Sequence, residues 1–599
     1  MSYFCVVAGT PMTEAARADF DLMAKALPFA EESSRVTWFG QRSANAHAPL
    51  WPEIELAQPA VYQGLHFVGD VRLDDPDQLR QALRGAGVDV EASCGDPHLI
   101  LRAYARWGDE CVSRLLGDFS FAICDGNGLL FCARDPLGIK PLFRAPLREG
   151  GWAVSNSIEA LRRHPQIGSA LDEYALADFL LFDMPCEPAR TIYSGIQRIP
   201  AGHFVTGRAG GEFRLRAYWQ PRFDQVENTL SIDHVEEIVR LLRQAIEARL
   251  PSEGGAILMS GGLDSTALAA LAREARPAAS LEAFTVAYDH LVPDDEARFA
   301  GIAAKHLDIP WSPCTGDDFA PFDQYRRFGV QPPEPLHEPD GGVYVAAYRE
   351  PARRHRVLLT GYDGDALLAD SPKPYLRHAM VHRRWLRASV ATAHYAFLER
   401  RIVPRSWRSQ PDRLGSRREL PEWLSPDFAA RLHLHQRWQD RASPAAPPTS
   451  LRPYAERSLG LLYRQSRFFE RFDPAVTGER IECRHPFMDL RVVRFCLTLP
   501  PVPWCVRKEL LRRAMRGRLP DSIVQRPKTP MQGAPLLAML QQSRSAWIDQ
   551  FDYNDRLAGY VLSDKIPRVH RESNMDRAWS NLRPLSLQLW LNQTPALNS

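Results

Sequence analysis

The sequence predicts an α/β protein of two domains, the second of them a doubly wound α/β domain. Three observations lead to this fold class. The chain has 599 residues, and a single hydrophobic core seldom grows beyond about 250–300 residues. Residues 1–215 are rich in apolar segments with the period-two alternation of strands. Residues 216–599 repeat strand, loop and helix, which is the order of a doubly wound sheet.

The first domain is expected to consist mainly of strands. Residues 116–125 (LGDFSFAICD) alternate as a strand does and end in the turn Asp125-Gly126-Asn127-Gly128, so residues 129–135 are expected to return as a hairpin partner. The further elements expected here are strands at 3–7 and 61–70 and helices at 76–83 and 99–108.

Composition excludes several classes of protein. Lys and Arg number 74 against 72 Asp and Glu, so the net charge of +2 gives no general affinity for nucleic acid. No apolar run reaches the length of a membrane span, and the first residues lack the pattern of a signal peptide. The ten cysteines contain no CxxC pair, which argues against a zinc site or a disulfide framework. We therefore expect a cytoplasmic protein that binds neither nucleic acid nor membrane.

The most informative stretch is residues 256–266 (AILMSGGLDST), in which a short apolar strand turns through two glycines into an Ala-rich helix. Amide N–H groups at a helix N-terminus favour a negative ligand. Gly261 and Gly262 let the backbone approach a polyphosphate closely, and Ser260 and Ser265 add hydroxyl groups. Asp264 repels phosphate unless a cation lies between them, so it predicts Mg²⁺.

The run SGGLDS lacks the Gly-Lys-Ser/Thr end of a Walker loop. It resembles instead the pyrophosphate loop of the ATP pyrophosphatases, which adenylate a carboxylate or carbonyl oxygen. The resemblance implies ATP as the nucleotide. It also implies that Met259 and Val286, at the ends of two neighbouring strands, line the adenine site.

Residues 117–161 resemble the N-terminal glutamine amidotransferase domain of asparagine synthetases, an Ntn-type αββα sandwich. The shared patterns are GDFSFA, RDPLGIKPL and SNSIEAL. Working members carry a nucleophilic cysteine directly after the initiator Met, where this chain has Ser2. Cys5 falls within a strand and is expected in the core. The domain is therefore predicted to be a degenerate glutaminase, and glutamine is not expected to supply nitrogen.

The segment 357–366 (VLLTGYDGDA) resembles the SGEGxDE segment of asparagine synthetases. The match implies that Thr360 and Gly361 contact ATP and that Asp365 joins Asp264 in holding Mg²⁺ on pyrophosphate. The family's glutamate is Tyr362 here, which is the pattern of β-lactam synthetases.

In β-lactam synthetases this tyrosine pairs with a downstream glutamate to deprotonate an amine, a role that Glu399 would fill by its distance in sequence. Near the end of the chain, ECRHPFMDL and LPDSIVQRPK resemble two further synthetase signatures. Arg484 and Asp489 of the first are expected to be structural. Lys528 of the second is expected at the reacting phosphate and acyl oxygens, where a fixed cation stabilises developing charge.

These resemblances imply a ligase in which a carboxylate attacks the α-phosphate of ATP and an amine then attacks the acyl-adenylate. Without a glutaminase, the amine is expected to belong to the substrate, and intramolecular closure gains an effective molarity of about 10⁵–10⁸ M. The chain's length, the loop PPEPLH at 332–337 and the Arg-rich helical segment at 372–470 resemble those of lasso-peptide cyclases. These enzymes form an isopeptide between a peptide's N-terminal amine and an Asp or Glu side chain.

The resemblance to lasso-peptide cyclases implies a precursor peptide as substrate, with the leader peptidase and leader-binding protein of the same pathway as partners. The alternatives are a β-lactam synthetase or an asparagine synthetase that acts on a small amino acid. A non-enzymatic nucleotide-binding scaffold is disfavoured, because Ser260, Asp264, Asp365 and Lys528 occur together.

Overall fold

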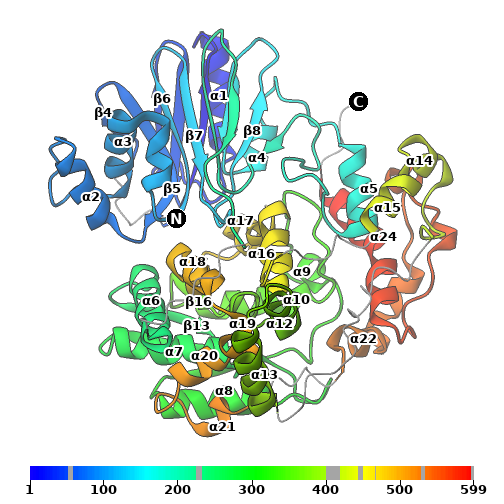
Figure 1. Cartoon of the computed structure of the whole chain (residues 1–599). Coiled ribbons are helices and arrows are strands. Elements are labelled where there is room, and N and C mark those ends of the chain that lie inside the picture. Colours follow the sequence, from blue (N-terminus) through cyan, green and yellow to red (C-terminus); the bar gives the residue numbers. More distant parts are fainter. Residues whose placement is uncertain are drawn as a thin grey trace.

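The computed structural model describes residues 1–51, 58–223, 233–399, 419–442, 450–465, 467–527 and 533–594. Two antiparallel six-stranded sheets form the N-terminal part, and a parallel five-stranded sheet forms the centre of the rest (Figure 1). In the described part of the chain, no helix combines the length and apolar character needed to cross a membrane.

The two N-terminal sheets have the strand orders β10-β8-β9-β1-β3-β2 and β12-β11-β7-β6-β5-β4. The strands are β1 (Ser2–Ala8), β2 (Val36–Phe39), β3 (Ser43–Pro49), β4 (Ala60–Tyr62), β5 (Leu65–Leu73), β6 (Gly117–Asp125), β7 (Leu129–Arg134), β8 (Phe143–Pro146), β9 (Trp152–Ser155), β10 (Gln197–Arg198), β11 (His203–Arg208) and β12 (Arg214–Ala217). The hairpin expected around Asp125 is confirmed as the antiparallel pair β6–β7.

Both faces of β1 are buried, because it lies inside a four-layer sandwich. Phe4, Val6 and Ala8 pack against the second sheet, whereas Tyr3, Cys5 and Val7 pack against the outer helices. Cys5 is fully buried, as expected, and burial raises the pKa of its thiol. The helices of this part are α1 (Glu14–Lys25), α2 (Pro76–Gly85), α3 (Asp96–Trp107), α4 (Ile158–Arg162) and α5 (Glu173–Phe182). The αββα fold class expected from the sequence is confirmed.

The single strand expected at residues 61–70 is wrong, because this segment is the hairpin of β4 and β5. Tyr62 pairs with Leu65 across a two-residue loop of Gln63 and Gly64. Both loop residues have positive φ, 50° and 76°, which is the backbone of a tight type I′ turn. Glycine adopts this conformation at little cost, so Gly64 was the local signal for the turn.

The second sheet system confirms the doubly wound α/β prediction. All of its strands are parallel and run in the order β15-β14-β13-β16-β17. The order reverses between β13 and β16, and ligands bind at the carboxyl ends of strands at such a point. The strands are β13 (Gly254–Leu258), β14 (Ser280–Ala287), β15 (Trp311–Thr315), β16 (Val357–Thr360) and β17 (Glu482–Arg484).

Helices connect and surround this sheet. The elements up to β17 are α6 (His234–Arg249), α7 (Leu263–Ala275), α8 (Glu296–His306), α9 (Asp323–Arg326), α10 (Gly341–Ala352), α11 (Gly364–Leu368), α12 (Pro372–Val381), α13 (Trp385–Glu399), α14 (Pro426–Arg431), α15 (Leu434–Ala442), α16 (Pro453–Gln465) and α17 (Pro474–Thr477). Those after it are α18 (Leu490–Thr498), α19 (Pro501–Trp504), α20 (Glu509–Ala514), α21 (Asp521–Val524), α22 (Pro535–Leu540), α23 (Asp555–Ala558) and α24 (Met575–Gln593).

The last helices return to the N-terminal part. Helix α24 lies beside α5, and Trp590 and Leu591 of α24 share a core with Leu180 and Tyr193 (Figure 1). Trp423 and Phe428 belong to the same core. The predicted boundary at 215/216 falls within the last N-terminal strand, β12, and remains a prediction.

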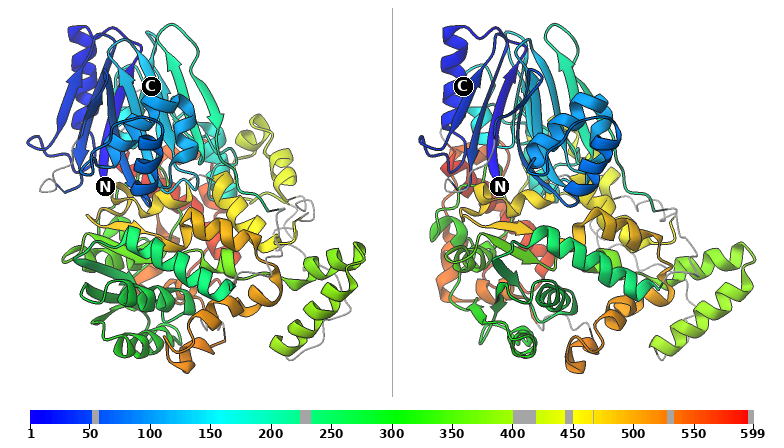
Figure 2. Two further views of the ribbon diagram at one scale, coloured as in Figure 1. Left: turned by 60° about the vertical axis from the view of Figure 1, so that its left-hand side comes forward. Right: turned by 90° about the vertical axis from the view of Figure 1, so that its left-hand side faces the viewer.

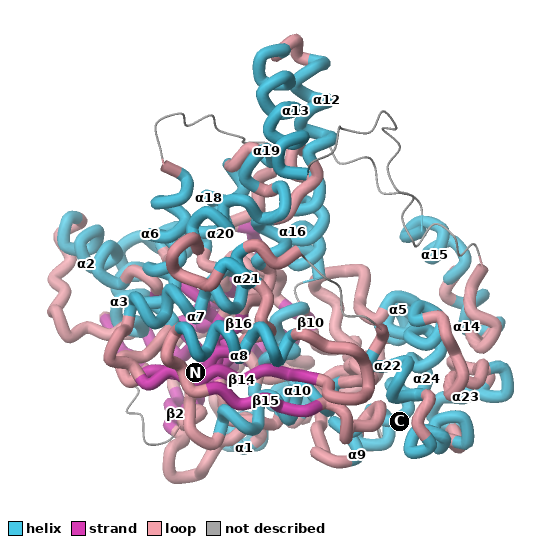
Figure 3. The backbone as a smooth tube through the Cα atoms, turned by 90° about the horizontal axis from the view of Figure 1, so that it is seen from below, coloured by secondary structure: helices cyan, strands magenta, loops and turns pink. Residues whose placement is uncertain are grey.

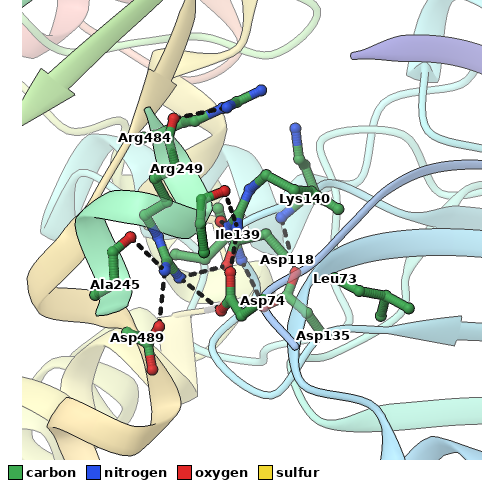
Figure 4. Close-up of polar contacts among 12 residues, drawn as sticks. Leu73, Asp74, Asp118, Asp135, Ile139, Lys140, Ala245, Arg249, Arg484 and Asp489 are labelled. Atoms are coloured by element: carbon green, nitrogen blue, oxygen red, sulfur yellow. Dashed lines mark hydrogen bonds and ion pairs between the residues drawn. The ribbon is translucent and has the colours of Figure 1, made fainter. Parts of the chain in front are cut away.

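A buried cluster of charges joins the two parts (Figure 4). Arg249, at the end of α6, contacts Asp118 at 3.3 Å and Asp74 at 3.1 Å from the N-terminal part, and Asp489 at 2.8 Å from its own part. Arg72 binds Asp74 and Asp118 from the other side. Arg484 donates to the carbonyl of Arg249 at 2.7 Å. The structural roles expected for Arg484 and Asp489 are confirmed by these contacts.

Two further clusters repeat the arrangement. Lys140 of the N-terminal part contacts Asp70 at 2.8 Å and Glu482 of β17 at 2.6 Å. Arg198, also N-terminal, pairs with Glu334 and with Glu470, the latter at 2.7 Å. These side chains are at most about one-tenth exposed, so each ion depends on a partner from the other part for compensation.

We expect Arg249→Met to destabilise the fold by about 3–5 kcal/mol, because it leaves three buried carboxylates without this cation. The difference in free energy of unfolding between wild type and variant becomes smaller as the pH falls. Without Arg249 the buried carboxylates have raised pKa values, so they take up protons and lose their charge. Urea unfolding at pH 8 and pH 5.5 measures both effects.

Arg240→Met is the matched control, because Arg240 lies on the same helix and forms an exposed pair with Glu237. We expect it to change stability by at most about 0.5 kcal/mol. Equal losses in the two variants would contradict the role given to the buried cluster.

Candidate active site

The loops that follow β13 and β16 meet at the point where the strand order reverses. A Cβ atom on Gly361 would lie 2.9 Å from the backbone nitrogen of Ser265, so the two loops touch only because this residue is glycine. A cavity of about 1000 Å³ opens between them. Its lining includes the predicted ATP residues Ser260, Gly262, Asp264, Ser265, Thr360 and Gly361.

The first loop presents the start of α7 to this cavity. Gly261 has a φ of +67°, and a Cβ there would come within 2.6 Å of the carbonyl oxygen of Glu296. Gly262 is the N-cap, and no side chain accepts a hydrogen bond at that cap. The hydroxyl of Ser265 accepts from the amide of Ser260 at 3.1 Å and fixes the loop's curvature. The N-terminus of a 13-residue helix therefore faces the cavity, an arrangement suited to polyphosphate.

The two carboxylates predicted to hold metal are brought together. The ammonium of Lys508 contacts Asp264 Oδ2 at 2.5 Å and Asp365 Oδ1 at 2.7 Å. A Cβ on Gly364 would lie 2.6 Å from the carboxyl carbon of Asp264, so the second turn packs directly on this carboxylate.

The sequence analysis assigned no role to Lys508. Lys508 and the preceding Arg507 both have positive φ, 57° and 53°. Non-glycine residues rarely adopt this backbone, and such strain gathers at functional sites. Here it turns the lysine side chain toward the two carboxylates.

The site fits a nucleotide-bound Mg²⁺ better than a protein-only metal centre. In the described ranges, no group of three or more His, Cys, Asp and Glu side chains forms a metal cluster. Mg²⁺ commonly binds through one or two carboxylates, with the remaining ligands from phosphates and water. Asp264 and Asp365 reach one common cation, Lys508, and so offer the two carboxylates that this mode requires.

Four cationic side chains, here called the basic wall, also line the cavity: Arg507, Lys508, Arg512 and Arg526. Arg526 donates to the carbonyl of Gly261 at 3.1 Å and stacks on Phe299. The predicted catalytic residue Lys528 lies outside the described residues. Pro527, immediately before it, lines the cavity.

Tyr362 lines the cavity and packs against Phe468 and Phe472. Burial raises the pKa of its phenol to about 12, so the hydroxyl is protonated at neutral pH and serves first as a hydrogen-bond donor. The hydroxyl of Thr360 and Nδ1 of His485 share a hydrogen bond of 2.7 Å. Burial lowers the pKa of His485 to about 3, which keeps the imidazole neutral.

The remaining predicted residues lie around the cavity. Glu399 ends α13, and its side chain is outside the described part of the chain. The carbonyl of the preceding Leu398 accepts a 3.2 Å hydrogen bond from Arg507, so this helix ends near the cavity. Met259 is buried, and its carbonyl accepts from the hydroxyl of Thr285 at 2.5 Å. Val286 packs against Tyr288 and its neighbours, so contact of Met259 and Val286 with adenine remains a prediction.

The position of the glutaminase nucleophile is closed. Ser2 is 1% exposed, and its hydroxyl donates to the carbonyl of Gly69 at 2.8 Å. Its amide contacts Asp70, which also pairs with Lys140. Asp96 accepts a hydrogen bond from the amide of Leu73 at 2.8 Å. These groups are hydrogen-bonded within the protein, and the hydroxyl of Ser2 at the start of β1 is not exposed.

Two protein families match different stretches of the chain. The asparagine synthase family matches residues 237–592, and the glutamine amidotransferase domain family matches residues 67–219. "Asparagine synthetase [glutamine-hydrolyzing] 3" of Bacillus subtilis is 25% identical over 76% of this chain and 74% of its own length. A "Putative asparagine synthetase [glutamine-hydrolyzing]" of Mycobacterium tuberculosis is 27% identical over 81% of this chain and 76% of its own length.

We expect Lys508→Met to lower stability by about 1–3 kcal/mol in the presence of a chelator, because two carboxylates then lose their shared cation. Mg²⁺ without nucleotide should raise the Tm of this variant more than that of the wild type, since Lys508 no longer competes for the carboxylates. Thermal unfolding with increasing Mg²⁺ measures this difference.

Lys305→Met is the matched control, since it removes an exposed ammonium from α8. Its response to Mg²⁺ should equal that of the wild type. An equal response in Lys508→Met would show that Asp264 and Asp365 do not receive the metal.

Proposed function

The chain belongs to the asparagine synthase family and is an ATP-using, amide-forming ligase of that type, and we propose that it closes a peptide ring. In this proposal ATP adenylates the side-chain carboxylate of an Asp or Glu in a precursor peptide. The peptide's N-terminal amine then attacks the acyl-adenylate and releases AMP, which leaves an isopeptide macrolactam. Mg²⁺ held by Asp264 and Asp365 would neutralise charge on the departing pyrophosphate.

The observation that carries the proposal is the closed glutaminase position. Ser2 stands where working relatives carry cysteine, and its hydroxyl is buried against the carbonyl of Gly69. In this proposal glutamine is therefore not hydrolysed at the start of β1 and supplies no ammonia. An amine already on the substrate needs no such source, and its attack on the same molecule gains the advantage of proximity.

The environment of Tyr362 supports an amine nucleophile. Its phenol lies in the cavity lining near the two carboxylate turns, where asparagine synthetases carry a glutamate. A neutral phenol with a raised pKa orients an amine by hydrogen bonding without adding a negative charge beside the acyl-adenylate. In the proposal Glu399 accepts the amine's proton and Lys528 stabilises the phosphate and acyl oxygens.

The partners of this reaction are also proposals. The precursor peptide is the substrate, and its leader segment would be recognised and removed by a leader-binding protein and a leader peptidase of the same pathway.

The second candidate is amide formation on a small amino acid, as in an asparagine synthetase that takes free ammonia or in a β-lactam synthetase. The relatives, which are asparagine synthetases by name, favour the first of these. Those names also specify glutamine hydrolysis, which the burial of Ser2 disfavours here.

We expect the purified protein, with ATP and Mg²⁺, to remove one water from a short precursor peptide encoded beside its gene, with release of AMP. Mass spectrometry of the peptide and chromatography of the nucleotides measure the two products together.

Asp264→Asn should lower the rate of this reaction by at least about 10²-fold, because a carboxylate at the pyrophosphate turn is lost. Asp295→Asn, an exposed position with the same change of charge, should leave the rate unchanged. Conversion of aspartate and ammonia to asparagine, with no change in the peptide, would assign the second candidate instead.

We expect Ser2→Cys to release no glutamate from glutamine, although it restores the residue type of the nucleophile. The reason is that residue 2 is buried, with its side chain against the carbonyl of Gly69 and its amide bound to Asp70. A coupled glutamate assay on wild type and variant measures this. Glutamate release by either protein would contradict a degenerate glutaminase.

A further inference from the structure

The helical hairpin of α12 and α13, residues 372–399, projects from the rest of the molecule (Figures 2 and 3). Leu376 and Ala391 anchor it against Val502 and Val506, and the two helices pack against each other. In Figure 3 the two helices extend together beyond α19.

The projecting hairpin exposes large apolar side chains. Leu386 is 79% and Phe397 82% exposed, and Val381, Trp385 and Val390 are exposed as well. Soluble proteins seldom gather such residues on one element without a partner, and such patches mark interaction sites. Burial of these side chains is therefore the expected source of binding energy at this surface.

The same surface is basic. Residues 371–398 contain no Asp or Glu. Their cationic side chains are Lys373, Arg377, Arg383, Arg384 and Arg387, accompanied by His378, His382 and His394. Arg383 and Arg384 are exposed at the turn between the helices. A partner with negative charge is favoured, because charge complementarity steers association and suppresses wrong partners.

The hairpin is joined to the active-site cavity at both of its ends. Ala369, Asp370 and Ser371 line the cavity, and α12 begins at the next residue. At the other end, Arg507 lines the cavity and donates to the carbonyl of Leu398. A chain that binds along the hairpin is thereby held beside the cavity mouth.

We propose that the α12–α13 hairpin binds an acidic segment, interspersed with apolar residues, of the peptide substrate. This segment lies outside the part that is ligated, and its binding places the reacting carboxylate at the cavity. The inference rests on the proposed function for the nature of the substrate. Tethering of this kind raises the local concentration of the reacting part without new contacts at the cavity.

Two other occupants fit the observations less well. A second copy that pairs hairpin to hairpin brings like charges together with no carboxylate in residues 371–398 to compensate them. A lipid surface suits a basic and aromatic helix in general. It does not account for a hairpin whose two ends are both joined to the cavity.

The test is fluorescence anisotropy of the full-length protein with labelled synthetic peptides. One peptide alternates Glu with Leu and Phe, a second replaces its Glu by Lys, and a third replaces its apolar residues by Ser. We expect the first to bind at least about tenfold more tightly than the other two, with affinity falling as salt rises. Equal binding of the three would overturn the proposal.

Variants locate the binding on the hairpin. Arg383→Glu with Arg384→Glu, and separately Leu386→Ser with Phe397→Ser, should each weaken binding of the first peptide about tenfold or more. The controls are Arg298→Glu with Arg353→Glu, and Leu22→Ser with Val61→Ser, which change exposed side chains of the same kinds elsewhere on the surface. Losses in the control variants equal to those in the hairpin variants would overturn the proposal. Thermal unfolding of each variant shows that the hairpin changes leave the fold intact.

Two further measurements separate this inference from the proposed function. With a precursor peptide that loses water, the hairpin variants should raise KM and leave kcat unchanged, whereas an unchanged KM would overturn the docking role and keep the ring-closing activity. If no peptide loses water but the acidic peptide still binds the hairpin, the proposed function is wrong, whereas the hairpin remains a binding surface for acidic peptides. Flotation with phosphatidylglycerol vesicles that is lost in the hairpin variants, without acidic-peptide binding, would assign the hairpin to lipid.

Discussion

Buried ion pairs between the two parts of the chain are the constraint on which the rest of the structure depends. Arg249, Lys140 and Arg198 each meet a carboxylate contributed by the other part. A buried ion that loses its partner costs several kcal/mol, so only one orientation of the two parts satisfies all of them. This gives the N-terminal sandwich a structural role that does not depend on catalysis by Ser2.

The short strand β17 connects this interface to the candidate active site. Glu482 forms an ion pair with Lys140. Arg484, two residues later, donates a hydrogen bond to the carbonyl of Arg249. The next residue, His485, forms a hydrogen bond with Thr360 and packs near Tyr362. The segment 482–485 therefore contacts the interface at its first residue and the cavity lining at its last. The position of Thr360 and Tyr362 is tied to the docking of the sandwich.

The cavity balances its charges before any ligand is considered. Asp264 and Asp365 contribute negative charge, and Lys508 lies between them. The remaining cations of the basic wall are placed where a polyphosphate needs them. Tyr362 adds a protonated phenol to a lining that also contains the carboxylates of Glu296 and Asp370. The charged lining thus suits an anionic nucleotide.

Much of the fold was predictable because its signals are local. Period-two alternation marks β6 and β7, and the run of residues 256–266 marks a strand, a phosphate loop and a helix. The hairpin at Gln63 and Gly64 was missed although glycine signalled it. Lys508 could not be placed, since it lies 244 residues from Asp264 and meets it only through the order of the strands. The sequence by itself determined most of the elements, the Gly-rich loop of residues 260–265 and the presence of serine in place of cysteine at position 2. The tertiary structure alone decided which charges meet, because contacts between distant segments follow from packing and not from local spacing.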